Sequence, residues 1–224
     1  MLFRKDFAMN TYKTVYRGGQ GEIEEKKSRF IANIFPISNE EEALDFLAKI
    51  KKQYWDARHN CFAYTVGKNF ELQRCSDDGE PGGTAGRPML DVLVKEGVHN
   101  CIVVVTRYFG GTLLGTGGLV RAYQKATQEG LANSTIIENM QGRQATIATD
   151  YNGIGKLQYL TAKNQIVTTD SRYTDRVELD VMIPLEKLDT FLAEVTEATS
   201  GKAGIHLKDI VEFAVLDGKV LIFK

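Results

Sequence analysis

The sequence predicts an α+β protein of two domains. Its 224 residues exceed the size of one common domain, which is about 100–150 residues. Short β-branched runs typical of strands are interspersed with segments whose apolar residues recur at helical spacing. Every glycine-rich motif lies before residue 133, and a self-contained series of strands and helices follows residue 142. We therefore expect one domain at residues 1–135 and a second at residues 140–224.

The first domain is predicted to mix strands and helices. Residues 11–17 alternate like an edge strand, and residues 23–35 continue as one long strand. Ser38 and Asn39 offer a helix cap, and the acids that follow them favour the start of a helix that runs to about Tyr54. The remaining expected elements are strands at 61–66 and 70–74, a helix at 89–96 ended by Gly97, a strand at 101–106 and a helix at about 117–132.

The second domain is predicted to follow the order βαββαβ. The expected elements are a strand at 143–150, a helix at 152–163, strands at 165–173 and 176–183, a helix at 184–199 and a strand at 204–215. This order is that of a ferredoxin-like domain. The strand at 143–150 has no aromatic residues on which bases could stack, so the domain is not an ordinary RNA-recognition motif.

Composition and charge narrow the function classes. The net charge is −1, so a strongly basic nucleic-acid-binding protein is excluded and any RNA contact must come from a local patch. The longest aliphatic run, Ile102 to Val105, is too short to cross a bilayer, and no secretory signal is evident. We expect a cytoplasmic protein without a membrane partner, in which Cys61 and Cys101 are buried and Cys75 is exposed. Met9 is an alternative start to Met1.

Two glycine-rich segments, at residues 77–88 and 107–123, carry the strongest functional signal. In the second, a strand-to-helix turn contains five glycines: Gly110, Gly111, Gly115, Gly117 and Gly118. Such a turn leaves backbone N–H groups that attract anions, and Arg107 and Arg121 flank it. Thr116 stands where a P-loop needs lysine, so the turn is not a nucleotide P-loop. The alternative is a glycine turn that only lets the strand and helix pack tightly.

The first glycine-rich segment contains the acids Asp77, Asp78 and Glu80. Their oxygens are ligands that Mg²⁺ or Ca²⁺ favours, but the spacing of a calcium loop is missing. We instead expect these acids to hold Arg87 or Arg107 in position, and we expect neither a metal nor a cofactor.

Several basic residues are candidates for phosphate contact. His59 follows Arg58 and lies near Trp55, so it could bind phosphate, act as a general base or simply begin a strand. Arg121 and Lys125 are four residues apart and share a helix face, which suits either a phosphate backbone or plain solvent. His99 and His206 belong to no such constellation and are expected at the surface.

The chain resembles the YigZ/IMPACT family in several motifs. They are Ala57-Arg58-His59-Asn60-Cys61-Phe62-Ala63-Tyr64, Asp77-Asp78-Gly79-Glu80-Pro81, Gly83-Thr84-Ala85-Gly86, Met89-Leu90 and Arg107-Tyr108-Phe109-Gly110-Gly111 with Gly115. The resemblance implies an N-terminal domain with the ribosomal protein S5 domain 2-like fold. It also implies a second domain like the C-terminal part of elongation factor G. No catalytic mechanism comes with it, so no catalytic residue is assigned.

The resemblance and the residues together favour a non-catalytic factor that binds RNA or the ribosome and modulates translation. Arg58, His59, Arg107, Arg121 and Lys125 would meet phosphate, and the glycine turns would admit the backbone closely. The alternative is an enzyme or binding protein in which Asp77, Asp78 and Glu80 act with His59 and Arg107 on a small phosphorylated compound. Nothing in the sequence indicates the oligomeric state.

Overall fold

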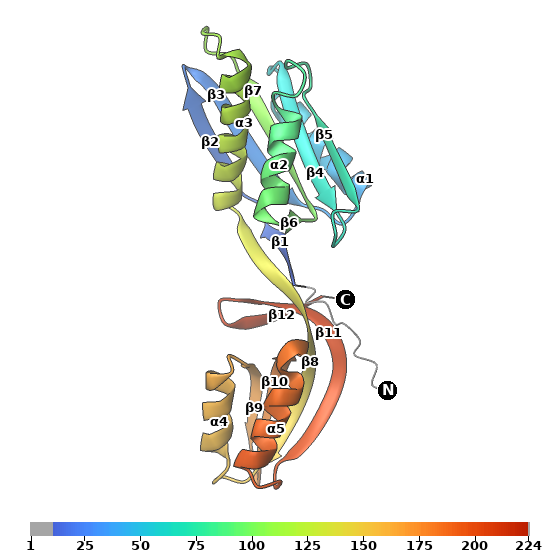
Figure 1. Cartoon of the computed structure of the whole chain (residues 1–224), viewed down its shortest axis with the longest axis vertical. Coiled ribbons are helices and arrows are strands. Elements are labelled where there is room, and N and C mark those ends of the chain that lie inside the picture. The colour runs from blue at the N-terminus through green and yellow to red at the C-terminus, as the bar shows by residue number, and fades with distance from the viewer. Residues whose placement is uncertain (1–10, 224) are drawn as a thin grey trace, which may run out of the picture. The chain divides into compact units, whose positions relative to one another are not determined.

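The structure is a computed structural model that describes residues 11–223, and it is a mixed α+β protein with two sheets (Figure 1). The chain divides into two compact units, here called the N-terminal unit (residues 12–137) and the C-terminal unit (residues 138–224). The division falls inside β8 (Thr135–Thr149), so the residues between the two expected domains, 136–139, belong to a continuous strand. The question of whether Met1 or Met9 is the start concerns residues outside the described range.

The N-terminal unit is built on an antiparallel five-stranded sheet. Its order is β2 (Gln20–Glu25), β3 (Ser28–Pro36), β7 (Cys101–Tyr108), β4 (His59–Val66) and β5 (Leu72–Ser76). A short parallel pair, β1 (Tyr12–Arg17) with β6 (Val98–His99), lies apart from this order. The central strand β7 is buried along most of its length, which agrees with its continuous apolar run.

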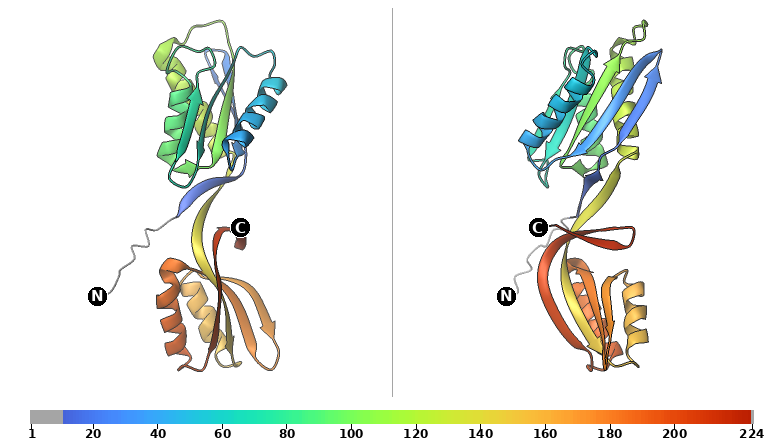
Figure 2. Two further views of the ribbon diagram at one scale, coloured as in Figure 1. Left: turned by 90° about the vertical axis from the view of Figure 1, so that its right-hand side faces the viewer. Right: turned by 180° about the vertical axis from the view of Figure 1, so that it is seen from behind.

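Helices cover both faces of this sheet (Figure 2, left). Because successive strand residues point to opposite faces, Val103 and Val105 pack under α2 (Gly86–Glu96) and α3 (Gly115–Ala132). Ile102 and Val104 pack instead under α1 (Glu40–Gln53). Arg107 has the same alternation as Val103 and Val105, so its side chain leaves the central strand on the face covered by α2 and α3.

Most expected elements are present, and two helix ends follow the sequence signals. Asn39 caps α1 by accepting the N–H of Glu42 at 2.9 Å, and Gly97 ends α2 in the left-handed conformation. The single long strand expected at residues 23–35 is wrong. Lys26 and Lys27 have φ values of 48° and 65°, so the chain turns there and forms the β2–β3 hairpin.

The prediction that His99 is a surface residue is also wrong. His99 is buried, its ring stacks on Phe70 at 3.7 Å between ring centroids, and its Nδ1 lies 3.2 Å from the carbonyl oxygen of Gly67. His206 is exposed, as expected. The expected burial of Cys61 and Cys101 and the exposure of Cys75 are confirmed.

The C-terminal unit has the expected βαββαβ order and one further strand. β8 is followed by α4 (Ile154–Lys163), β9 (Val167–Tyr173), β10 (Val177–Pro184), a 3₁₀ turn (Leu185–Lys187), α5 (Leu188–Ala198) and β11 (Gly204–Leu216). The antiparallel strands lie in the order β11-β8-β10-β9, and β12 (Lys219–Phe223), which we did not predict, pairs with β11. Both helices pack on one face, where Ile147, Val181 and Phe191 are buried.

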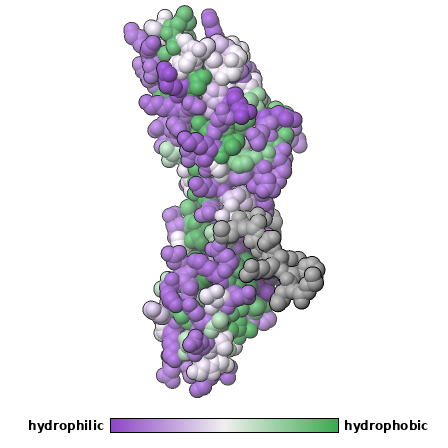
Figure 3. Space-filling model, viewed as in Figure 1, coloured by the Kyte–Doolittle hydropathy of each residue, from purple (hydrophilic) through white to green (hydrophobic). Residues whose placement is uncertain are grey.

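Large apolar side chains at the surface come from both units of the chain. Figure 3 shows hydrophilic residues over most of the drawn face, with hydrophobic residues in small groups between them. Among the described residues, Trp55 and Leu113 are the most exposed large hydrophobic residues, each 83% exposed. No helix of residues 11–223 is both long and apolar enough to span a membrane.

Candidate functional site

A pocket of about 460 Å³ opens in the N-terminal unit where β4 begins and β7 ends. Its lining includes Arg58, His59, Arg107, Phe109 and Leu113. The sheet register brings the first three together, because His59 lies directly opposite Arg107 on the neighbouring strand. Asp56 and Tyr108 complete the lining and are joined to each other, with the Tyr108 hydroxyl donating to the Asp56 carboxylate at 2.7 Å.

Arg107 is held by a buried polar network. Its Nη1 donates to Oε1 of Glu80 at 2.6 Å, and the same oxygen accepts the hydroxyl of Tyr123 at 2.9 Å. Burial raises the pKa of Tyr123, which keeps this phenol protonated as a donor. The expectation that an acid of the loop at residues 77–80 holds Arg107 is confirmed for Glu80. Arg87 instead pairs with Asp91 on its own helix.

The guanidinium of Arg107 is only partly satisfied. Its side chain is 8% exposed, yet its buried Nε has no hydrogen-bond partner in the described part of the chain. The guanidinium carbon lies 5.4 Å from the ring centroid of Phe30 and 5.6 Å from that of Phe109. An unpaired donor on a buried cation is costly, so Arg107 offers an unused donor beside the pocket.

His59 is oriented by the acidic loop. Its Nδ1 lies 2.9 Å from the backbone carbonyl oxygen of Asp78, and because a carbonyl only accepts, Nδ1 carries the hydrogen. In the neutral ring Nε2 is then an acceptor, and in the protonated ring it is a second donor. The loop thus fixes which nitrogen of His59 remains available to a ligand.

The acids of the loop support backbone rather than gather around a ligand. Asp77 accepts the N–H groups of Gly83 at 2.8 Å, Ala85 at 3.0 Å and Gly86 at 2.8 Å. Burial alone would raise the pKa of Asp77, but the three N–H groups outweigh it and the pKa is lowered. Asp77 therefore stabilises the start of α2.

Asp78 and Thr84 have similar supporting roles. Asp78 accepts the N–H of Asn60 at 2.7 Å and the ammonium of Lys51 at 2.8 Å, while the Thr84 hydroxyl donates to the carbonyl of Pro81. Among the described residues, no group of three or more His, Cys, Asp or Glu side chains is arranged to hold a metal ion.

The glycines of the turn before α3 have two different structural roles. A Cβ at Gly110 would lie 2.0 Å from the carbonyl carbon of Lys27, so only glycine fits there. Gly111 and Gly115 have φ values of 86° and 71°, which glycine adopts without strain. Gly117 and Gly118 lie in the first turn of α3, where Leu114 provides no side-chain cap. Tight packing is thus shown at Gly110, while anion binding at the turn stays a prediction.

Arg121 and Lys125 are exposed on one face of α3, as their spacing predicted. Neither of them lines the pocket that contains Arg58, His59 and Arg107. The predicted basic residues therefore form two groups: one in the pocket and one on the solvent side of the helix.

Sequence reasoning missed the apolar part of the site. Phe109 is 53% exposed and Leu113 is 83% exposed, and both line the pocket. The signal available was their position in a loop beside glycines, where no apolar core is formed. Tyr123 was missed as well, because its contact with Glu80 joins residues 43 positions apart in the chain.

Comparison with known proteins places both parts of the chain in described families. The profile of the Impact N-terminal domain matches residues 26–131, and that of a domain of unknown function, DUF1949, matches residues 147–202. A crystal structure of a hypothetical protein, 32% identical, superposes with a TM-score of 0.57 over 90% of this chain and 98% of its own.

The sequence relatives are similar over most of the chain. IMPACT family member YvyE of Bacillus subtilis is 42% identical over 197 residues, which is 88% of this chain and 91% of YvyE. IMPACT family member YigZ of Escherichia coli is 36% identical over 79% of this chain and 87% of YigZ. Protein IMPACT of Mus musculus is 38% identical over 98 residues, which is 42% of this chain and 30% of that protein. The resemblance expected from the motifs is confirmed, and the chain belongs to the IMPACT family.

Proposed function

We propose that the N-terminal unit binds RNA, as a cytoplasmic factor that acts on the ribosome and modulates translation without catalysing a reaction. The observation that carries the proposal is the unpartnered Nε of the buried Arg107, in a pocket whose lining also contains Arg58, His59 and Phe109. Arginine and histidine donors suit phosphate oxygens, and phosphate contacts supply most of the affinity in RNA binding.

The aromatic side chains favour RNA over an isolated phosphate. Phe109 is half-exposed beside Arg58 and His59, and Trp55 is exposed on the turn that leads into β4. Unstacked bases of single-stranded RNA commonly stack on such aromatic faces, at about 1–3 kcal/mol per base. The pocket therefore combines cationic side chains suited to phosphate with an exposed aromatic ring suited to base stacking.

The hydrogen bonds of the acidic residues argue against the alternative function, an enzyme that acts on a small phosphorylated compound. Asp77 and Asp78 are bonded to backbone N–H groups, and Glu80 is shared by Arg107 and Tyr123. Asp56 is the carboxylate that lines the pocket, and its Oδ1 accepts the hydroxyl of Tyr108. The three acids named for that alternative, Asp77, Asp78 and Glu80, therefore already have protein partners, which favours a structural role for them over the role of a general base.

The fold assignments belong to the same proposal. The strand order β11-β8-β10-β9 with both helices on one face suits the ferredoxin-like fold for residues 140–224. The N-terminal unit would then be the S5 domain 2-like domain at residues 1–135. Both folds occur in translation proteins, although fold alone does not determine function.

The proposal is tested by fluorescence anisotropy with a labelled single-stranded RNA and by co-sedimentation with ribosomes at low salt. Arg58→Ala should weaken binding about tenfold or more, because it removes a charge-assisted contact. Phe109→Ala should weaken binding to single-stranded RNA more than binding to duplex RNA, because only unstacked bases reach an aromatic face.

Lys95→Ala is the matched control. Lys95 is an exposed cation in the last turn of α2, and it does not line the pocket. It should bind RNA like the unchanged protein. Equal loss in Arg58→Ala and Lys95→Ala would mean that the pocket has no special part in binding. A protein that binds neither RNA nor ribosomes at low salt would contradict the proposal outright.

A further inference from the structure

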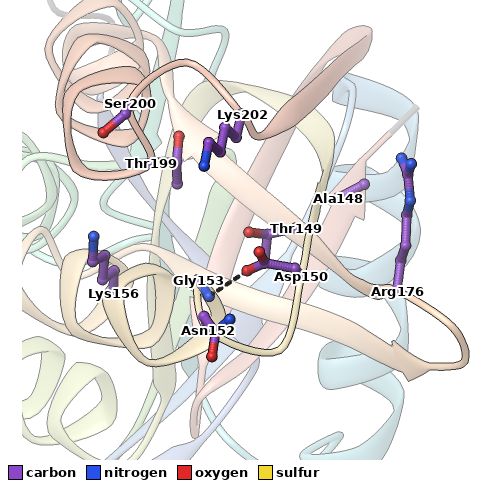
Figure 4. Close-up of a pocket in the computed structure, with 10 residues that line it drawn as sticks. All are labelled: Ala148, Thr149, Asp150, Asn152, Gly153, Lys156, Arg176, Thr199, Ser200 and Lys202. Atoms are coloured by element: carbon purple, nitrogen blue, oxygen red, sulfur yellow. Dashed lines mark hydrogen bonds between the residues drawn. The ribbon is translucent and has the colours of Figure 1, made fainter.

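A second pocket, of about 410 Å³, lies within the C-terminal unit (Figure 4). It is formed where β8 ends and α4 begins, and the loop after α5 and the turn between β9 and β10 complete it. Its lining is mostly polar and includes three cations, Lys156, Arg176 and Lys202, against the single carboxylate Asp150. This balance of charge favours an anionic ligand.

The carboxylate and one of the cations are already engaged. Asp150 accepts the N–H of Gly153 at 2.8 Å, and the Lys156 ammonium donates to the carbonyl of Ala198 at 2.8 Å, at the end of α5. Lys202 has no ion-pair partner in the described range, and Figure 4 shows its ammonium directed toward Thr199, on the side of the pocket across from Thr149 and Asp150. Arg176 lies apart from these residues and points away from them.

Thr149 supplies the observation that singles out this pocket. It is 6% exposed, and none of residues 11–223 forms a hydrogen bond with its hydroxyl. The hydroxyl lies so close to Gly153 that a Cβ on that glycine would be 2.1 Å from the oxygen. The residue is largely buried, but its hydroxyl oxygen is not among the buried unpaired polar atoms, so this hydroxyl is accessible from the pocket and free to pair with a ligand oxygen.

The start of α4 borders the same pocket. The N–H of Gly153 is bonded to Asp150 and that of Lys156 to the carbonyl of Gly153, so the donors left in this turn are those of Ile154 and Gly155. Gly153 is its N-cap and provides no side chain, so the first N–H groups of this 10-residue helix have no side-chain cap from that residue. A Cβ at Gly155 would meet nothing within 4 Å, which leaves open space beside the first turn. At the opposing end of α5, the carbonyls of Thr196, Ala198 and Thr199 accept hydrogen bonds from Gly201, Lys156 and Lys202, which partly offsets the negative end of the helix dipole.

We propose that this pocket binds the phosphate group of a small phosphorylated ligand, held by Lys202, the Thr149 hydroxyl and the first N–H groups of α4. A small ligand is favoured over RNA because residues 138–224 carry 10 Lys and Arg against 13 Asp and Glu. Arg172 is moreover committed to Asp170, Glu178 and Asp180. An acidic surface repels a polyanion, whereas a pocket with local positive charge can still bind one phosphate group.

The test is an NMR titration of the ¹⁵N-labelled full chain with inorganic phosphate, and then with adenosine monophosphate, at neutral pH and constant ionic strength. Both probes should give saturable shifts at the amides of residues 149–156 and 199–203. Lys202→Ala should weaken both probes about tenfold or more. Thr149→Val should also weaken them, while the free energy of unfolding stays unchanged or rises, because the lost hydroxyl had no protein partner.

Lys219→Ala is the control, because Lys219 is an exposed cation of the same unit that does not line the pocket. It should bind both probes like the unchanged protein. The proposal would be overturned if sodium chloride alone produced the same amide shifts. It would also be overturned if both probes still produced these shifts in Lys202→Ala and in Thr149→Val. A single-stranded RNA that shifts these amides more strongly than adenosine monophosphate would overturn the choice of a small ligand.

Discussion

Glu80 and Arg107 form an ion pair in the N-terminal unit with 2.6 Å between Oε1 and Nη1, and their side chains are only 3% and 8% exposed. The pair joins the acidic loop to the central strand β7. It compensates the charge of Arg107 on one side and leaves Nε without a partner. The same contact thus gives Glu80 of the loop a structural role and leaves one donor of a buried arginine unused.

Breaking this pair should strongly destabilise the N-terminal unit. In Glu80→Gln the carboxylate is lost, and Arg107 becomes a buried charge without a counterion. The free energy of unfolding measured in urea should fall by about 3–5 kcal/mol. Glu22→Gln, which breaks the exposed pair with Arg29, should cost about 1 kcal/mol or less. Equal effects in the two variants would show that the Glu80–Arg107 pair is not the structural centre of this site.

Asp77 should make stability depend on pH. Its pKa is lowered from the ordinary value of 3.8 in the folded state, so the carboxylate form favours folding. This contribution is present above the unfolded pKa and is lost as the pH falls through the lower, folded pKa. Asp77→Asn should therefore cost about 1–2 kcal/mol at neutral pH and progressively less below about pH 3.8.

Asp91→Asn is the control for this prediction, because Asp91 is an exposed acid of α2 that forms a surface ion pair with Arg87. It should change the free energy of unfolding by about 0.5 kcal/mol or less at any pH. A cost of Asp77→Asn that is the same at acidic and neutral pH would contradict the lowered pKa.

Gly110 should tolerate no side chain. In Gly110→Ala the new Cβ would collide with the backbone of Lys27 and Ser28, which cannot move away without opening the β2–β3 hairpin. We expect a loss of about 2 kcal/mol or more, measured by thermal or urea unfolding. Gly82→Ala should be tolerated, because its Cβ would meet nothing within 4 Å. A stable Gly110→Ala protein would show that the turn is looser than described.

The three cysteines should differ in reactivity. Burial raises the pKa of Cys61 and Cys101 to about 12, whereas Cys75 is exposed. A thiol reagent such as DTNB should therefore modify one cysteine in the native protein and all three after denaturation. Because burial also raises the pKa of Cys75, its reaction should be slower than that of free cysteine and should accelerate as the pH rises. Rapid native modification of Cys61 would contradict its burial.

The sequence was most informative where a local signal decides the structure. Asn39 marks the start of α1 and Gly97 marks the end of α2, as predicted. The strand β7 was predicted from one apolar run. The β2–β3 turn was missed because two lysines occupy positive φ without the glycine or asparagine that usually marks it. His99 was misplaced because its burial depends on Phe70 and Tyr12, which lie far from it in the chain.

The sequence identified many residues of the candidate site but did not predict how they are arranged in space. Arg58, His59 and Arg107 were identified from motifs, and the sheet register brings them together. The separation of Arg121 and Lys125 from that pocket depends on where α3 lies against the sheet, which a helical pattern does not give. The exposure of Phe109 and Leu113 likewise follows from a loop conformation rather than from residue type.

The central claim, that the N-terminal unit binds RNA through phosphate contacts, is tested most directly by the salt dependence of RNA affinity. In Arg121→Ala/Lys125→Ala two exposed cations of α3 are removed, and folding should change by about 0.5 kcal/mol or less. If both contact phosphate, affinity should fall for all RNA sequences alike. The log–log salt slope should shrink by about 1.4 to 1.8 units relative to the unchanged protein. An unchanged slope would remove this helix from the interface, and the absence of any RNA or ribosome binding at low salt would contradict the claim itself.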